Sequence, residues 1–300
     1  MTALRAFLSE MIDYAGLFPP AGLSMSEAVK NYSEYLTGAD SDLLGRFVVP
    51  ADRIDEFADA AMNFLPRSER ATPWRVSAIA RGDLAAVKKD LLEFNCSHWS
   101  GSDLGHAVID SVEIAVNGET EIESAAMTVS GAFETFLEIP ATLDPSSLIH
   151  AIGRSGARAK IRTGGVVSEA FPNAAAVVRF ITACNAQGVR FKATAGLHHP
   201  LRASYALTYD AGSPTAPMFG YLNVFLASAF VHVGFPETTV TEVLEEGDSR
   251  TMTFDDHGVE WRGHRISREQ LSATRNELAR SFGSCSFHDP VAEARQLGAL

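Results

Sequence analysis

Two short segments place a lysine where an apolar run ends at a glycine. They read AKIRTGG (159–165) and FKATAG (191–196), and their lysines are Lys160 and Lys192. The chain has only five lysines in all, so two of them share one local setting. A buried ammonium group is costly, and a second cation beside it lowers its pKa. A lysine with a lowered pKa is typical of Schiff-base enzymes, because only the neutral amine attacks a carbonyl. Alternatively, each lysine pairs with a carboxylate and braces the protein core.

Two glutamates offer carboxylates for the same chemistry. Glu113 lies in the middle of the apolar run DSVEIAV (110–116), where a charge indicates an active-site wall. Glu138 comes near the end of FETFLEIP (133–140). Each glutamate is a candidate acid/base group or, alternatively, a salt-bridge partner of a lysine.

These residues belong to a repeating pattern of strands and helices. Helical stretches separate the predicted strands, and such repetition favours a parallel sheet with crossover helices. Six units before residue 200, in a chain of 300 residues, predict a (β/α)8 TIM barrel, of class α/β. The predicted strands are 45–50, 74–80, 107–116, 133–140, 157–164 and 189–196.

The barrel fold predicts where the candidate residues point. Catalytic groups of such barrels lie at the C-terminal ends of the strands. Alternation puts Lys160 and Arg162 on one face of their strand, and Lys192 and Thr194 on one face of the next. If these strands are neighbours, two lysines and an arginine converge on one small space.

The pattern changes after residue 200. We expect one barrel domain over 1–300 with an insertion at 205–266, made of a helix and a β-hairpin, before the last strand. The apolar run 218–235 is interrupted by polar residues and predicts a buried helix. The hairpin consists of TMTF, the turn DDHG and VEWRGHRI, and we interpret it as a lid or an oligomer contact. The last strand is predicted at 280–287.

Adjacent histidines in a loop provide a rival signal. His198 and His199 follow the sixth predicted strand. They are candidates for ordinary hydrogen bonding, for substrate binding or proton transfer, or for metal binding completed by Glu113, Glu138 or His288. The last option is the alternative function of a metal-dependent lyase or hydrolase on the same barrel. Neighbouring side chains in an extended run point apart, which opposes a shared metal ion.

Seven segments, in order along the chain, resemble those of the deoxyribose-phosphate aldolase family, a class I aldolase barrel. They are IDYAGLFPPAG, FVVP, VEIAVN, FLEIP, AKIRTGG, FKATAG and FGSCSF. The resemblance implies that Lys160 is the Schiff-base nucleophile and that Lys192 lowers its pKa. It also implies that Glu113 stands where the family has a catalytic aspartate. The turn in FGSCSF corresponds to a phosphate-binding turn.

Several departures from the family pattern leave the substrate open. The carboxylate at position 113 is longer by one methylene, and Arg162 has no counterpart in the family. The segment LHHPLR follows where the family contacts phosphate. The anionic end of the substrate is therefore either a phosphate or a carboxylate. Candidate substrate-contacting residues are Asp13, Glu138, Arg162, Thr163, His198, His199, Gly283, Ser284 and Ser286.

Two further segments contain candidate site residues. The prolines and glycines of DYAGLFPPAG (13–22) predict a fixed loop, which either brings Asp13 to the site or caps the barrel. Cys285 lies in GSCS, and no His–Cys motif is visible there, which argues against a thiol nucleophile.

The composition and charge of the chain exclude some classes of binding partner. The formal net charge of −12 and the pI of about 5.2 oppose nucleic acid and anionic membranes. Three widely spaced cysteines and a start without a signal-peptide pattern predict a cytoplasmic protein. The prediction is a class I aldolase or other lyase for a small anionic carbonyl compound. It forms a homo-oligomer and uses no cofactor, since the protonated imine is itself the electron sink. The third possibility is a non-catalytic barrel that binds a small ligand.

Overall fold

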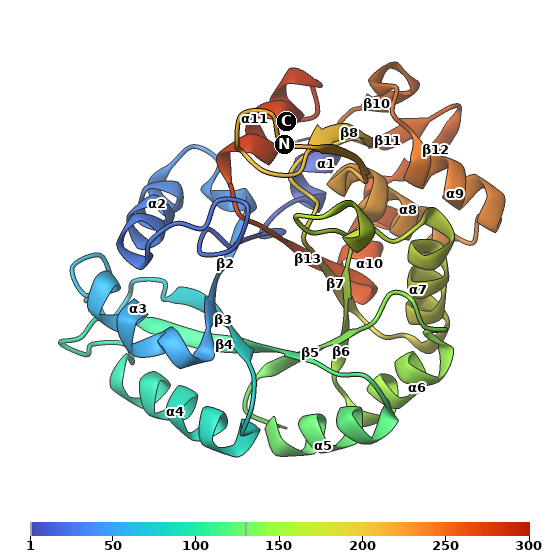
Figure 1. Cartoon of the computed structure of the whole chain (residues 1–300). Helices are drawn as coiled ribbons and strands as arrows, with labels where there is room; N and C mark the ends of the chain where they lie inside the picture. Colours follow the sequence, from blue (N-terminus) through green and yellow to red (C-terminus); the bar gives the residue numbers. More distant parts are fainter. Residues whose placement is uncertain (1, 130) are drawn as a thin grey trace.

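The strands close into a parallel barrel in the computed structural model, which describes residues 2–129 and 131–300. The order around the barrel is β1-β13-β7-β6-β5-β4-β3-β2, and every neighbouring pair is parallel. The helices surround the strands as an outer ring (Figure 1). The predicted TIM barrel is confirmed. Its strands are β1 (Ile12–Tyr14), β2 (Leu44–Pro50), β3 (Trp74–Ala80), β4 (Ala107–Ala115), β5 (Glu134–Ile139), β6 (Arg158–Arg162), β7 (Phe191–Thr194) and β13 (Ala279–Ser284).

Local sequence signals fix the ends of several helices. Ser24 and Glu27 form a capping box at the start of α2. Gly156 and Gly188 end α6 and α7 in the left-handed conformation, directly before strands β6 and β7. The α-helices are α1 (Ala3–Phe7), α2 (Met25–Thr37), α3 (Ile54–Ala61), α4 (Leu84–Ser97), α5 (Glu119–Val129), α6 (Ser146–Ser155), α7 (Ala174–Gln187), α8 (Tyr221–Val233), α9 (Glu237–Glu245), α10 (Arg268–Glu277) and α11 (His288–Gln296). Short 3-10 helices span Ser41–Leu43, Ala51–Arg53, Ser168–Ala170 and Ser249–Thr251.

The segment that was expected to be a fixed loop contributes a barrel strand. Residues Ile12–Tyr14 form β1, which lies between β13 and β2. The strand has three residues and all of them are buried. A strand this short has no alternation of apolar and polar residues to read, which is why the pattern did not reveal it.

The chain between β7 and β13 adds two small antiparallel sheets. Strands β8 (Ala203–Ala206) and β9 (Thr215–Met218) form a hairpin that the sequence pattern did not predict. Strands β10 (Met252–Phe254), β11 (Gly258–Trp261) and β12 (His264–Ser267) form the second sheet. The second arm of the predicted hairpin is therefore two strands. It turns at Arg262 and Gly263, which both have positive φ.

The apolar run 218–235 forms the buried helix α8, as expected. Its Phe225 stacks on Phe191 of β7 and packs at an angle on Phe282 of β13, so α8 covers this part of the barrel. Among the described residues, no helix has the length and apolar character needed to cross a membrane.

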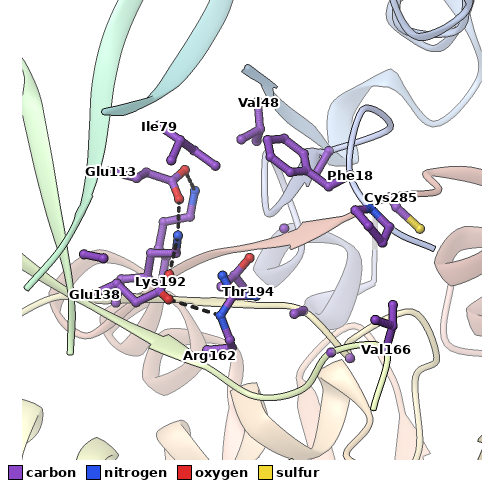
Figure 2. A pocket seen from close by; sticks show the side chains of 18 of the residues that line it. Phe18, Val48, Ile79, Glu113, Glu138, Arg162, Val166, Lys192, Thr194 and Cys285 are labelled. Atoms are coloured by element: carbon purple, nitrogen blue, oxygen red, sulfur yellow. Dashed lines mark hydrogen bonds and ion pairs between the residues drawn. The ribbon is translucent and has the colours of Figure 1, made fainter. Parts of the chain in front are cut away.

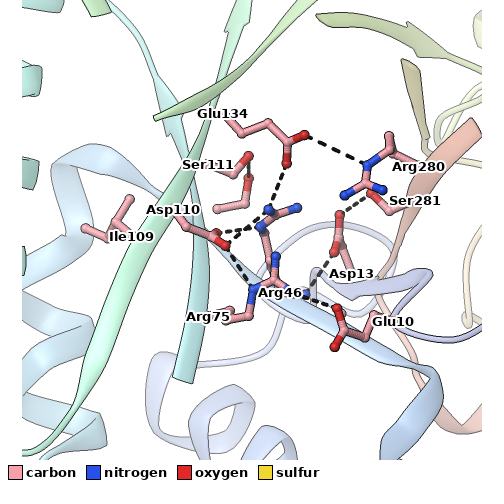
Figure 3. Close-up of polar contacts among 12 residues, drawn as sticks. Glu10, Asp13, Arg46, Arg75, Ile109, Asp110, Ser111, Glu134, Arg280 and Ser281 are labelled. Atoms are coloured by element: carbon pink, nitrogen blue, oxygen red, sulfur yellow. Dashed lines mark hydrogen bonds and ion pairs between the residues drawn. The ribbon is translucent and has the colours of Figure 1, made fainter. Parts of the chain in front are cut away.

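Paired charges gather at the N-terminal ends of the barrel strands (Figure 3). Arg46 of β2 is nearly buried and pairs with Asp110 and with Glu134, at 2.9 Å from the latter. Arg75 also pairs with Asp110, at 2.9 Å, and Arg158 pairs with Glu134, at 2.6 Å. Ion pairs thus link β2, β3, β4, β5 and β6 at this end, whereas the opposite end is hollow.

Candidate active site

A cavity of about 340 Å³ opens at the C-terminal ends of the barrel strands. Both lysines of the repeated segments line it, together with Glu113, Glu138 and Arg162. The remaining lining is largely apolar, and it includes Phe18, Val48, Ile79, Ala115 and Val166 (Figure 2).

Lys160 and Lys192 lie side by side on the adjacent strands β6 and β7. They are Cα partners in the pairing of β6 with β7, and both side chains point into the barrel. Lys160 is 3% exposed and Lys192 is 1% exposed. The predicted convergence of the two lysines on one space is what the structure shows.

Glu113 bridges the two ammonium groups. Its Oε2 lies 2.7 Å from Nζ of Lys160, and its Oε1 lies 2.6 Å from Nζ of Lys192. Ser77 donates a further hydrogen bond of 2.7 Å to Oε1. Burial alone would raise the pKa of Glu113, but the two lysines outweigh it and hold the pKa well below its usual range.

Lys192 has a second carboxylate partner from β1. Its Nζ donates to Oδ2 of Asp13 at 2.6 Å. Asp13 is itself held by the backbone N–H of Arg46, at 2.8 Å, and by the hydroxyl of Ser281, at 2.7 Å. Burial lowers the pKa of Lys192, but Asp13 and Glu113 outweigh burial and raise it above its ordinary value. Lys192 is therefore a fixed cation.

Lys160 is tied in the same way to a glutamate nearer the solvent. Its Nζ lies 2.6 Å from Oε2 of Glu138, and Nε of Arg162 donates to Oε1 of Glu138 at 3.1 Å. Burial raises the pKa of Glu138, yet Lys160 and Arg162 together lower it. The Arg162 side chain is 52% exposed.

Six charges thus alternate in sign from the barrel interior to its mouth. We name this the charge series: Asp13, Lys192, Glu113, Lys160, Glu138 and Arg162. It contains three anions and three cations, so its formal charge is zero. Each lysine does have carboxylate partners, as the bracing alternative expected, and two of these carboxylates, Glu113 and Glu138, line the cavity.

The glycines that follow the two lysines explain the shared sequence setting. Gly164 and Gly196 lie against each other, because a Cβ built on Gly164 would come 2.8 Å from Cα of Gly196. Gly196 also has a φ of +72°. Thr163, which is buried, donates to the carbonyl of Ala195 at 2.7 Å. The turns after β6 and β7 therefore pack backbone to backbone, which keeps the two lysine-bearing strands in register.

The adjacent histidines have different surroundings. His198 lines the cavity, and its Nδ1 contacts Ser284 and Cys285. His199 instead contacts Glu293 of α11 at 2.8 Å and stacks on the ring of Tyr205. Within residues 2–129 and 131–300, no group of three His, Cys, Asp or Glu side chains is arranged to hold a metal ion.

The serine hydroxyls of the predicted phosphate-binding turn form hydrogen bonds with other groups of the protein. Gly283 lines the cavity. Ser284 donates to the carbonyl of Ser286 at 2.6 Å, and the hydroxyl of Ser286 accepts the N–H of Asp289 at 3.1 Å. Of the expected substrate-contacting residues, Glu138, Arg162, His198 and Gly283 line the cavity, whereas Asp13, Thr163, His199, Ser284 and Ser286 lie outside its lining.

Several lining residues were not singled out from the sequence. Phe18 comes from the β1–α2 loop, and Arg81 follows β3 directly. The strand-end position of Arg81 was a signal available in the pattern. Cys285, for which the sequence shows no His–Cys motif, lies with its Sγ 3.6 Å from Nδ1 of His198. The two residues are 87 positions apart, so no local motif pairs them.

The fold and the cavity define a TIM barrel with a charged, partly apolar pocket at the end where this fold carries its active sites. No protein-family model matches the chain, and no curated protein is significantly similar to it in sequence.

Proposed function

We propose that this barrel is a Schiff-base-forming lyase of the class I aldolase type that acts on a small carbonyl compound. The observation that carries the proposal is the arrangement of Lys160 and Lys192 in register at the floor of the cavity, with Glu113 between their ammonium groups. The ordered resemblance to deoxyribose-phosphate aldolases supports the same chemistry.

Lys160 is the nucleophile in this proposal. Lys192 is held from both sides by Asp13 and Glu113 and has a raised pKa, so it stays protonated. Lys160 stands two places further along the charge series, beyond Glu113, and pairs with Glu138, which in turn pairs with Arg162 at the mouth. A substrate that enters from solvent therefore meets Lys160 before it meets Lys192.

Glu138 takes the proton that Lys160 must lose. The transfer from Nζ to Oε2 spans 2.6 Å and turns an ion pair into two neutral groups, so the net charge of the site does not change. Glu113 is less suited to exchange protons with solvent, since three donors bind it and its side chain is 2% exposed, against 16% for Glu138. Glu113 serves to hold both lysines.

The reaction then follows ordinary imine chemistry. The amine of Lys160 adds to the substrate carbonyl, and water leaves as Glu138 returns its proton, which gives a protonated imine. The bond between the α and β carbons of the substrate then breaks, its electron pair forms the enamine as the imine π electrons move to nitrogen, and the β-hydroxyl gives its proton to Glu138 as it becomes an aldehyde. Protonation of the enamine and hydrolysis return the lysine. No organic cofactor is required, because the imine accepts the electron pair.

Borohydride trapping tests the proposal. The protein is incubated with small aldehydes, ketones and keto acids, reduced, and mapped by mass spectrometry. We expect an adduct on Lys160 that is lost in Lys160→Met and weakened in Lys192→Met. The control is Lys89→Met, since Lys89 is a surface lysine with a 73% exposed side chain. An adduct on Lys192 alone would reverse the two roles. No adduct on either lysine, together with stoichiometric metal in the purified protein, would overturn the proposal in favour of metal-dependent chemistry.

A further inference from the structure

A second polar cluster faces the cavity away from the lysines. It consists of His198, Ser284, Cys285, Tyr209 and Asp289, which we call the His198 cluster. His198, Cys285 and Gly283 line the cavity, and Cys285 is drawn at the opposite side from Glu113 in Figure 2. The reaction proposed above gives this cluster no role.

The hydrogen positions in the cluster can be inferred, because the carbonyl of Ser286 and the carboxylate of Asp289 at its two ends can only accept hydrogen bonds. Ser284 gives its single hydroxyl hydrogen to the carbonyl of Ser286 at 2.6 Å. Tyr209 gives its hydroxyl hydrogen to the carboxylate of Asp289 at 3.0 Å. A carbonyl and a carboxylate have no hydrogen to offer in return. The oxygens of Ser284 and Tyr209 are therefore left as acceptors.

The directions of the remaining contacts follow. Burial raises the pKa of the Cys285 thiol, so the sulfur keeps its hydrogen, and both Tyr209 Oη and Nδ1 of His198 lie near it, at 3.8 and 3.6 Å. The nearer neighbour of Nδ1 is Oγ of Ser284, at 3.3 Å. This oxygen has no hydrogen left to donate, and a bare Nδ1 would face its lone pairs, so the contact places the hydrogen on Nδ1.

The other ring nitrogen of His198, Nε2, therefore has no hydrogen and can only accept a hydrogen bond. Burial, followed by the neighbouring His199, lowers the pKa of His198 to about 4, although Asp289 acts in the opposite direction. The ring is neutral near pH 7 and has one hydrogen, which is on Nδ1. Nε2 has no hydrogen-bond partner within the part of the chain that the structure describes, and the ring lines the cavity.

We propose that Nε2 of His198 accepts a hydrogen bond from a hydroxyl group of the substrate, which makes His198 a specificity-determining residue for hydroxylated carbonyl compounds. The carbonyl part of this inference rests on the proposed function. A neutral acceptor favours a hydroxyl, because a carboxylate or phosphate oxygen at this point would meet a lone pair. Ser284 already gives its hydroxyl hydrogen to the carbonyl of Ser286, so it offers such an anion no donor.

A matched pair of ketones tests the inference. Hydroxyacetone and butanone have similar size, and only the first has a hydroxyl. We expect half-maximal borohydride trapping on Lys160 at about tenfold lower concentration of hydroxyacetone, the order of effect of one hydrogen bond between neutral groups. In His198→Asn the side-chain amide can still donate to Ser284, but nothing replaces Nε2. The preference should fall to about one, because hydroxyacetone loses a hydrogen bond that butanone never makes. The control is His150→Asn, on the outer face of α6. A tenfold preference that persists in His198→Asn would overturn the inference.

Nitrogen-15 NMR of the histidine rings separates this inference from the proposed function. With His198→Asn used to assign its signals, His198 should show hydrogen on Nδ1 and a pyridine-type Nε2. The Nε2 signal should move on addition of 1,2-propanediol, which has hydroxyls but cannot form an imine. Hydrogen on Nε2, or an Nε2 signal that the diol leaves unmoved, would overturn the inference. Absence of trapping by both ketones would instead count against the imine chemistry.

Discussion

The ammonium group of Lys192 reaches across the neighbouring strand β13 to the carboxylate of Asp13 on β1, at 2.6 Å. The two residues lie 179 positions apart in the chain. Each is 1% exposed, so neither charge has water as an alternative partner. Removal of one partner from such a buried pair leaves an uncompensated charge.

We therefore expect Asp13→Asn to be strongly destabilising. The loss in the free energy of unfolding should be about 3 kcal/mol or more, as for other broken buried pairs. Urea denaturation of the variant measures it. Asp59→Asn, at an exposed position of α3, is the control and should stay within about 0.5 kcal/mol of the wild type. Equal stability of the two variants would show that Lys192 does not depend on Asp13.

The charge series also predicts how stability changes in acid. The pKa of Glu138 is lower in the folded protein than its ordinary value of 4.5. The unfolded chain therefore binds more protons below about pH 4.5, and stability falls as the pH decreases toward the folded pKa. Glu138→Gln should flatten this dependence, and Glu123→Gln on the surface of α5 should not. Denaturation midpoints across the acid range provide the measurement, and identical slopes for wild type and Glu138→Gln would contradict the prediction.

The contact between Gly164 and Gly196 predicts a steric effect on the site. In Gly164→Ala the new Cβ would meet the Phe171 ring at 2.5 Å and Cα of Gly196 at 2.8 Å. Overpacking of this kind costs about 1–3 kcal/mol, and the shift needed to relieve it acts on the strands of both lysines. We expect lower stability and slower imine trapping. Gly118→Ala is the matched control, because a Cβ there meets nothing within 4 Å. Normal trapping by Gly164→Ala would show that the close approach is not needed.

The ion pairs at the N-terminal end of the barrel should support folding without affecting the chemistry. Arg46→Met removes the partner shared by Asp110 and Glu134 and should cost about 3 kcal/mol. The backbone N–H at position 46 still binds Asp13, so the folded variant should trap the same carbonyl compounds on Lys160. Arg53→Met breaks only an exposed pair with Glu56 and should cost less than about 1 kcal/mol. A loss of trapping in well-folded Arg46→Met would show that the two ends of the barrel are coupled.

The sequence predicts the barrel because most of its strands repeat one pattern. Six strands precede residue 200, and each has enough residues for its apolar character to be recognised. The sequence pattern did not predict β1, because this strand has only three residues. The turn at Arg262 and Gly263 was not predicted, because a positive φ at an arginine has no propensity signal. Two short strands were therefore interpreted as one.

The direction in which each lysine points was predictable from the sequence, but the register between their two strands was not. The inward direction of Lys160 and Lys192 follows from alternation along each strand. Their pairing at the same level is a property of the folded barrel, in which β6 pairs with β7 and Gly164 packs on Gly196. Contacts such as Lys192 with Asp13, or His198 with Cys285, join residues that only the closed barrel brings together. The sequence offers Glu113 and Glu138 as candidate partners of the lysines, but the pairing of Lys192 with Asp13 could not be inferred from the chain alone.

The alternation of the charge series has a consequence for any imine formed at Lys160. A protonated imine has one positive charge on the same nitrogen, as the ammonium group does. Glu113 and Glu138, at 2.7 and 2.6 Å, then face the same charge before and after the covalent bond forms. The surrounding carboxylates need not move to stabilise the intermediate, so the resting protein already has the charges that a protonated imine at Lys160 would need around it.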